Sequence, residues 1–151
     1  MRPDQVPAGP LLVDTDVVSL LALNEDRADE FEALIQGHEL FVCFVTVAEV
    51  ETLLRLNVLG ADHQAALAAA LAGYSRFDVD LDTVVDRWAD LRAATRSTTS
   101  RNDRERRQND TWLAACALSV ADPPAIVTAD LSDLLPIAGV AGLTIVHPDL
   151  D

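Results

Sequence analysis

Short apolar runs alternate with stretches of helical periodicity along the chain, and this alternation restricts the possible folds more than any other feature. We expect strands at residues 11–13, 40–45, 77–79, 126–128 and 143–146. Strands separated by helices of ten or more residues are joined by right-handed crossovers, which make the strands parallel. The pattern therefore predicts an α/β fold in which helices cover both faces of a parallel sheet.

Apolar residues at helical spacing predict helices between these strands. We expect them near residues 17–21, 31–35, 46–54, 61–72, 83–97 and 109–120. Thr46 is the expected start of the third helix, and Asn109 or Asp110 the expected start of the last. Residues 97–108 contain no apolar side chain and are expected to form a loop.

The length of 151 residues suits one domain, and residues 1–9 are expected to be a flexible N-terminal extension. No apolar run approaches the ~18 to 20 residues that cross a bilayer, so we expect no membrane segment and a cytoplasmic location. Cys43 and Cys116 both lie in apolar runs, which predicts reduced thiols in the core rather than a disulfide framework.

Charge is distributed unevenly along the chain. The formal net charge is −14 and all the cations are arginines, which argues against general affinity for nucleic acid. Residues 92–107 nevertheless carry six arginines against two acids. This segment is either a solvated loop or an arm that contacts phosphates. The candidate phosphate contacts are Arg101, Arg104, Arg106 and Arg107.

Carboxylates recur just after the predicted strands. They are Asp14, Asp16, Glu49, Asp110, Asp130 and Asp133. Each can be explained locally: Thr46 and Glu49 match a capping box, and an Asp in a first helical turn is favoured by the helix dipole. Because the carboxyl ends of parallel strands share one edge of a sheet, we also expect these acids to lie together.

The negative charge of such an acidic cluster must be neutralised for the fold to be stable. Two unit charges ~4 Å apart repel by about 4 kcal/mol at an effective dielectric near 20. Carboxylate oxygens without clustered His or Cys select Mg²⁺ or Mn²⁺. Such ions activate water and stabilise the leaving oxygen of a phosphodiester, which makes metal-dependent phosphoryl chemistry the predicted activity.

Four segments that contain these acids resemble PIN-domain proteins, specifically VapC-type toxins of toxin–antitoxin pairs. The segments are LLVDTDVVSLL, FVTVAEVETLL, NDTWLAACAL and IVTADLSDLL. The resemblance implies a three-layer α/β/α sandwich with a five-stranded parallel sheet. It also implies endoribonuclease activity with Mg²⁺ or Mn²⁺ at an acidic tetrad, and inhibition by a VapB-type antitoxin.

When the four motifs are matched to those of the family, the resemblance implies a catalytic tetrad of Asp14, Glu49, Asp110 and Asp130. Asp133 remains an alternative fourth acid and a further candidate metal ligand. Four more polar residues are candidates for supporting roles: Asp16, Thr15, Thr128 and Asn109.

Two other functions remain open. Asp14-Thr15-Asp16 after a strand resembles the DxD motif of haloacid-dehalogenase-type phosphatases, in which Asp14 is the nucleophile, although the chain lacks the usual lysine. A non-catalytic interaction module is the other possibility. The apolar residues between Leu53 and Leu59 then form an interface for a homodimer or an antitoxin, unless they are ordinary core.

Overall fold

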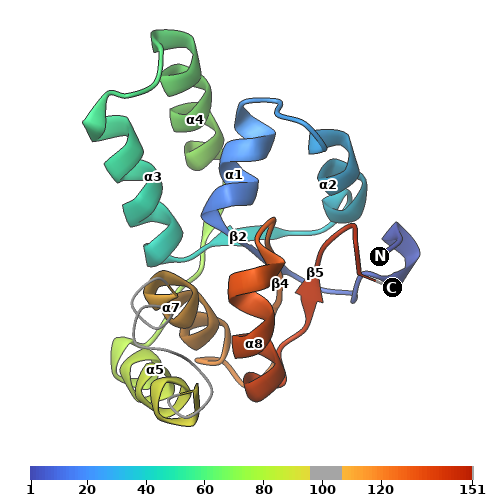
Figure 1. Ribbon diagram of the computed structural model, residues 1–151, viewed down its shortest axis with the longest axis vertical. Coiled ribbons are helices and arrows are strands. Elements are labelled where there is room, and N and C mark those ends of the chain that lie inside the picture. Colours follow the sequence, from blue (N-terminus) through green and yellow to red (C-terminus); the bar gives the residue numbers. More distant parts are fainter. Residues whose placement is uncertain (96–106, 151) are drawn as a thin grey trace.

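The computed structural model describes residues 1–95 and 107–150, and its centre is a five-stranded parallel sheet (Figure 1). The strands are β1 (Leu11–Val13), β2 (Leu40–Val42), β3 (Ser75–Arg76), β4 (Ala125–Val127) and β5 (Ile145–Val146). Their order across the sheet is β3-β2-β1-β4-β5. The predicted α/β class and the parallel sheet are therefore confirmed.

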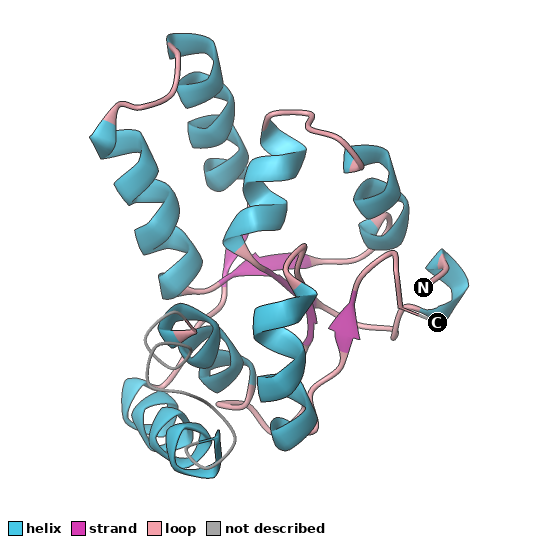
Figure 2. Ribbon diagram, viewed as in Figure 1, coloured by secondary structure: helices cyan, strands magenta, loops and turns pink. Residues whose placement is uncertain are grey.

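Helices form a layer on each face of this sheet (Figure 2). They are α1 (Thr15–Ala22), α2 (Ala28–Ile35), α3 (Phe44–Leu56), α4 (Ala61–Gly73), α5 (Leu81–Thr95), α7 (Gln108–Ala117) and α8 (Leu131–Ala141). The first four pack on one face, and α5, α7 and α8 pack on the other. No helix within the described ranges is long and apolar enough to span a membrane.

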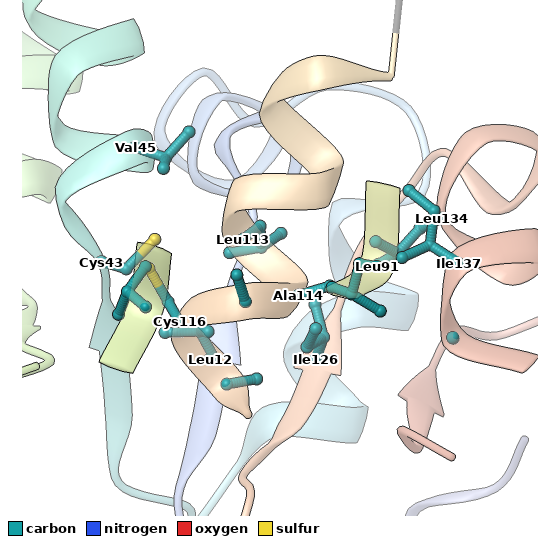
Figure 3. Close-up of a cluster of buried hydrophobic side chains, with 14 of the residues drawn as sticks. Leu12, Cys43, Val45, Leu91, Leu113, Ala114, Cys116, Ile126, Leu134 and Ile137 are labelled. Atoms are coloured by element: carbon teal, nitrogen blue, oxygen red, sulfur yellow. The ribbon is translucent and has the colours of Figure 1, made fainter. Parts of the chain in front are cut away.

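The central strands are buried on both faces, which explains their uninterrupted apolar sequences. In β1, Leu11 and Val13 pack with α1 to α4, whereas Leu12 points to the opposite layer. There Leu12 belongs to a buried cluster with Leu113 and Ile126 (Figure 3). Two separate cores thus hold the two helical layers against one sheet.

The two cysteines lie in this second core and are free, as the sequence predicts. Their sulfurs come from different elements, Cys43 from the end of β2 and Cys116 from α7 (Figure 3). A hydrogen bond from the Cys116 thiol lowers the pKa of Cys43 to about 7.

Several element boundaries differ from the sequence prediction. β2 ends at Val42 and α3 begins at Phe44, so the helix starts before Thr46. Residues 40–45 form one apolar run although Val42, Cys43 and Val45 are buried and Phe44 is exposed, so hydrophobicity alone does not mark the boundary between strand and helix. The third strand is Ser75–Arg76 rather than 77–79, and α7 begins at Gln108 with Arg107 as its N-cap.

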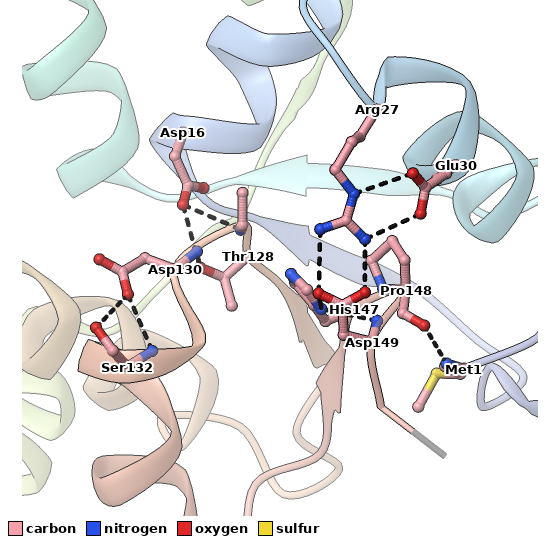
Figure 4. A network of polar contacts seen from close by, with 11 residues as sticks. Met1, Asp16, Arg27, Glu30, Thr128, Asp130, Ser132, His147, Pro148 and Asp149 are labelled. Atoms are coloured by element: carbon pink, nitrogen blue, oxygen red, sulfur yellow. Dashed lines mark hydrogen bonds and ion pairs between the residues drawn. The ribbon is translucent and has the colours of Figure 1, made fainter.

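The N-terminal segment contacts the C-terminal segment, although the sequence predicts a flexible extension over residues 1–9. A short 3-10 helix, η1, spans Pro3–Gln5, and the Met1 ammonium group donates to the Pro148 carbonyl at 2.6 Å (Figure 4). Beside it, the Arg27 guanidinium bridges the carboxylates of Glu30 and Asp149.

Candidate functional site

The strand order reverses between β1 and β4, because the chain passes from β1 towards β3 on one side and from β4 to β5 on the other. Open parallel sheets bind ligands at such a point, beyond the carboxyl ends of the strands. Asp14 follows β1 here, and its backbone N–H donates to the Val127 carbonyl at 2.9 Å. The end of β4 therefore lies directly beside Asp14.

Asp14 and Asp16 are held by hydrogen bonds at this edge. Asp14 is the N-cap of α1, where its side chain accepts from the Thr15 N–H at 2.7 Å. The buried Thr128 hydroxyl lies 3.0 Å from Asp14 Oδ2 and 3.4 Å from Asp16 Oδ2. A hydroxyl has one proton to donate, so Asp14 is the better placed acceptor. Asp16 also accepts from the Ala129 N–H at 3.0 Å (Figure 4).

Glu49 reaches the same edge from α3. Its carboxylate accepts from the Thr15 hydroxyl and, at 2.5 Å, from the Asn109 amide of α7. The predicted capping box of Thr46 and Glu49 is wrong, because Cys43 is the N-cap of α3. The Thr46 hydroxyl instead donates to the Val13 carbonyl at 3.2 Å. Asn109 is likewise not a helix cap but a link between α7 and Glu49.

Asp110 lies in the first turn of α7 and interacts electrostatically with acids from three other elements. Its pKa is raised to about 6, chiefly by burial and then by the charges of Asp133, Asp130, Glu49 and Asp16. Asp110 therefore lies near enough to each of these four acids to interact with it electrostatically.

Burial is also the main reason why the pKa of Asp14 is raised, followed by the charge of Asp16 and, more weakly, that of Asp110. Burial raises the pKa of Asp16 too. Carboxylates that stand far apart in the sequence thus form a single acidic cluster.

The two candidates for the fourth acid have different environments. Asp130 is exposed and is the N-cap of α8, where its Oδ1 accepts from the N–H groups of Ser132 and Asp133. Asp133 is buried and pairs with Arg107, whose Nε donates to Oδ1 at 3.0 Å.

The ion pair between Arg107 and Asp133 was not predicted from the sequence. Arg107 also donates to the Ser132 carbonyl at 3.1 Å, so its guanidinium is bonded within the protein. The other predicted phosphate contacts, Arg101, Arg104 and Arg106, lie outside the described residues.

The donor chemistry of the cluster fits a hard divalent cation. In the described part of the chain, no arginine forms an ion pair with Asp14, Asp16, Glu49 or Asp110. Over the same residues, no three acidic, His or Cys side chains are already arranged to hold a metal. The cluster therefore supplies the oxygen ligands that a hard divalent cation prefers, and in the described residues it has no preformed coordination shell.

A cavity of about 560 Å³ adjoins the acidic cluster. Glu49, Thr15 and Asn109 line its polar end, and Phe44 and Trp112 are among its apolar walls. The sequence analysis did not identify this cavity, because its aromatic residues come from two helices that are far apart in the chain.

Comparisons with known proteins agree with this architecture. The family model of the PIN domain matches residues 11–132. No curated protein sequence matches the chain.

Three solved structures illustrate the structural similarity. VapBC2 from Rickettsia felis bound to a promoter DNA fragment has a TM-score of 0.65 at 14% identity, over 90% of this chain and 96% of that one. FitAcB from Neisseria gonorrhoeae has a TM-score of 0.60 at 17% identity, over 91% and 97% of the two chains. PAE2754 from Pyrobaculum aerophilum has a TM-score of 0.56 at 21% identity, over 91% and 83%.

Proposed function

The chain belongs to the PIN domain family, and on this basis we propose that it is a Mg²⁺- or Mn²⁺-dependent endoribonuclease that acts as the toxin of a toxin–antitoxin pair. The observation that carries the proposal is the convergence of Asp14, Asp16, Glu49 and Asp110 at the β1/β4 edge. The structural similarity to VapBC2 and FitAcB supports a toxin of this type.

Asp14, Glu49 and Asp110 are the proposed metal ligands, and Asp130 is the proposed fourth acid. Asp133 is the alternative fourth acid, and its ion pair with Arg107 must open before its carboxylate can bind a metal. When bound, Mg²⁺ or Mn²⁺ lowers the pKa of water and offsets the charge of the scissile phosphate.

The remaining polar residues have positioning roles in this proposal. Thr15 and Asn109 hold the Glu49 carboxylate, and Thr128 orients Asp14. Hydrolysis is expected to proceed by in-line attack of water and to leave a 3′-hydroxyl and a 5′-phosphate. Arg101, Arg104, Arg106 and Arg107 are proposed to hold flanking phosphates, for which Arg107 must leave Asp133.

The proposed partner is a VapB-type antitoxin with a cationic inhibitory segment. An arginine that enters the acidic cluster competes with the metal for the same carboxylates. A homodimer is proposed as well, because Leu56 and Val58 are 62% and 69% exposed. Other residues of this apolar stretch, Leu53, Leu54 and Leu59, pack against the core. We also propose a cytoplasmic location, where an RNA substrate is present.

The decisive experiment measures RNA cleavage with Mn²⁺ and with EDTA, for the wild type, Asp14→Asn and Glu49→Gln. Both substitutions should abolish cleavage and weaken Mn²⁺ binding measured by calorimetry. Glu51→Gln is the matched control, since Glu51 lies on the same helix but pairs with Arg55. Full-rate cleavage in EDTA, or by Asp14→Asn, would show that the proposed mechanism is wrong.

A phosphatase that uses Asp14 as nucleophile is the second candidate function, because Asp14-Thr15-Asp16 follows β1. The absence of lysine from the sequence argues against it. Trapping of a phosphoaspartate at Asp14 would favour the phosphatase over the nuclease. If the chain is a non-catalytic interaction module, the folded wild type should cleave no RNA with Mg²⁺ or with Mn²⁺.

A further inference from the structure

The cavity beside the acidic cluster has an aromatic wall. Phe44 is 43% exposed, and its ring packs edge-on against Trp112 with the ring centroids 6.1 Å apart. Trp112 in turn stacks on Trp88 at 4.8 Å, and the Arg92 guanidinium lies 5.4 Å from the Trp88 ring centroid. An exposed ring supported by two stacked indoles provides a fixed surface on which a planar group can stack.

The polar side of the cavity is rich in acceptors. The hydroxyl protons of Thr15 and Thr52 are donated to Glu49 and to the Ala48 carbonyl, and an amide proton of Asn109 is donated to Glu49. The cavity therefore offers mainly oxygen lone pairs and the negative charge of Glu49 to an occupant. This chemistry disfavours a phosphate and favours a group that carries N–H donors.

A nucleobase with an exocyclic amino group meets both requirements. Its flat face can stack on an aromatic side chain, and its amino group can donate to the acceptors around Glu49. Glu49 belongs to the acidic cluster and also lines the cavity. A nucleotide whose phosphate lies at the cluster would therefore have its base within reach of this cavity.

We propose that the cavity between Glu49 and Phe44 is a base-binding subsite for the nucleotide next to the scissile phosphate. It prefers adenine, guanine or cytosine to uracil, because uracil lacks an exocyclic amino group. The proposal rests on the proposed nuclease function, since it places the scissile phosphate at the acidic cluster.

Nucleosides provide a test that depends on neither metal nor cleavage. The chain has two tryptophans, and Trp112 lines the cavity, so titration with cytidine or adenosine should change the tryptophan fluorescence of the metal-free protein. Uridine should bind more weakly. Phe44→Ala should weaken cytidine binding by about 5- to 150-fold, the range found when a stacking aromatic is removed, whereas Phe44→Tyr should retain it.

Val85→Ala is the matched control, because Val85 is 44% exposed but lies on α5 outside the cavity. Its cytidine affinity should equal that of the wild type. In the cleavage assay, an abasic nucleotide beside the cleaved bond should slow the wild type but have little further effect on Phe44→Ala.

Two results would overturn the base-binding subsite. One is equal cytidine affinity in wild type and Phe44→Ala. The other is that Phe44→Ala weakens only the binding of an arginine-containing apolar peptide, which would make the cavity a protein-docking surface. Cytidine binding by a protein that cleaves no RNA would refute the nuclease function and leave the subsite standing. RNA cleavage and cytidine binding that Phe44→Ala leaves unchanged would refute the base-binding subsite and leave the nuclease function standing.

Discussion

Asp110→Asn is expected to make the metal-free protein more stable while it removes RNA cleavage. Asp110 has a pKa of about 6 in the folded protein, against an ordinary value of 3.8. Each pKa unit corresponds to about 1.36 kcal/mol, so charging Asp110 costs the folded state up to about 3 kcal/mol. Because the side chain is partly exposed to solvent, we expect a gain of about 1 to 2 kcal/mol from the substitution.

The pH dependence of this gain follows from the direction of the shift. A carboxyl group with a raised pKa in the folded state destabilises the protein fully at pH values above that pKa, here about 6. At pH values far below the pKa of the unfolded state, the group is protonated in both states and has no effect. Asp110→Asn should therefore be more stable than the wild type at about pH 8, and most of the difference should be lost by about pH 4.

Urea unfolding in EDTA at both pH values measures the effect, and a rise of about 2 to 8 °C in Tm should accompany it at high pH. Asp62→Asn is the control, since Asp62 is also an acid in a first helical turn but is exposed on α4. It should give no gain, because an acid there interacts favourably with the helix dipole.

An Asp110→Asn variant that is no more stable than the wild type in EDTA at high pH would show that the charge of Asp110 does not destabilise the fold. A gain of equal size at low pH would show the same, because the effect would then not come from the charge. Added Mn²⁺ should stabilise the wild type more than Asp110→Asn.

Three further substitutions can be tested by urea unfolding, two at contacts near the site and one at the C-terminal end of α8. Arg107→Ala should cost about 1 to 3 kcal/mol, because it removes the ion pair that Arg107 forms with the buried Asp133. Adding Asp133→Asn should recover part of this loss, and a full loss in the double variant would contradict it. Thr46→Val should cost about 1 kcal/mol, because the buried hydroxyl donates to the carbonyl at the end of β1; an unchanged urea midpoint would show that this bond contributes nothing. Gly142→Ala should cost about 1 kcal/mol, because this helix cap has a φ of +68°, whereas Gly139→Ala within α8 should be neutral or stabilising.

The fold class was predictable because the buried strands carry a local signal. Leu11–Val13 and Ala125–Val127 are apolar at every position, as expected for strands covered on both faces. The helices between them bury apolar faces of ordinary spacing, such as Phe31, Leu34 and Ile35 in α2. Both patterns depend only on neighbours in the sequence.

Helix starts were less predictable because capping residues can also form tertiary bonds. Thr46 and Asn109 have the side chains of good N-caps, and the sequence favours them in that role. In the folded chain Cys43 and Arg107 occupy the cap positions, while Thr46 bonds to β1 and Asn109 bonds to Glu49. The cap therefore lies three residues before the expected one in α3 and two residues before it in α7.

The sequence by itself determined that acids follow the strands, because that depends only on the order of residues along the chain. The tertiary structure alone decided the partner of each acid: Thr128 for Asp14, Asn109 for Glu49 and Arg107 for Asp133. Thr128 stands 114 positions from Asp14 in the sequence. Such pairs form only when β1 and β4 become neighbours in the sheet and the helices pack on it, and no local pattern encodes that arrangement.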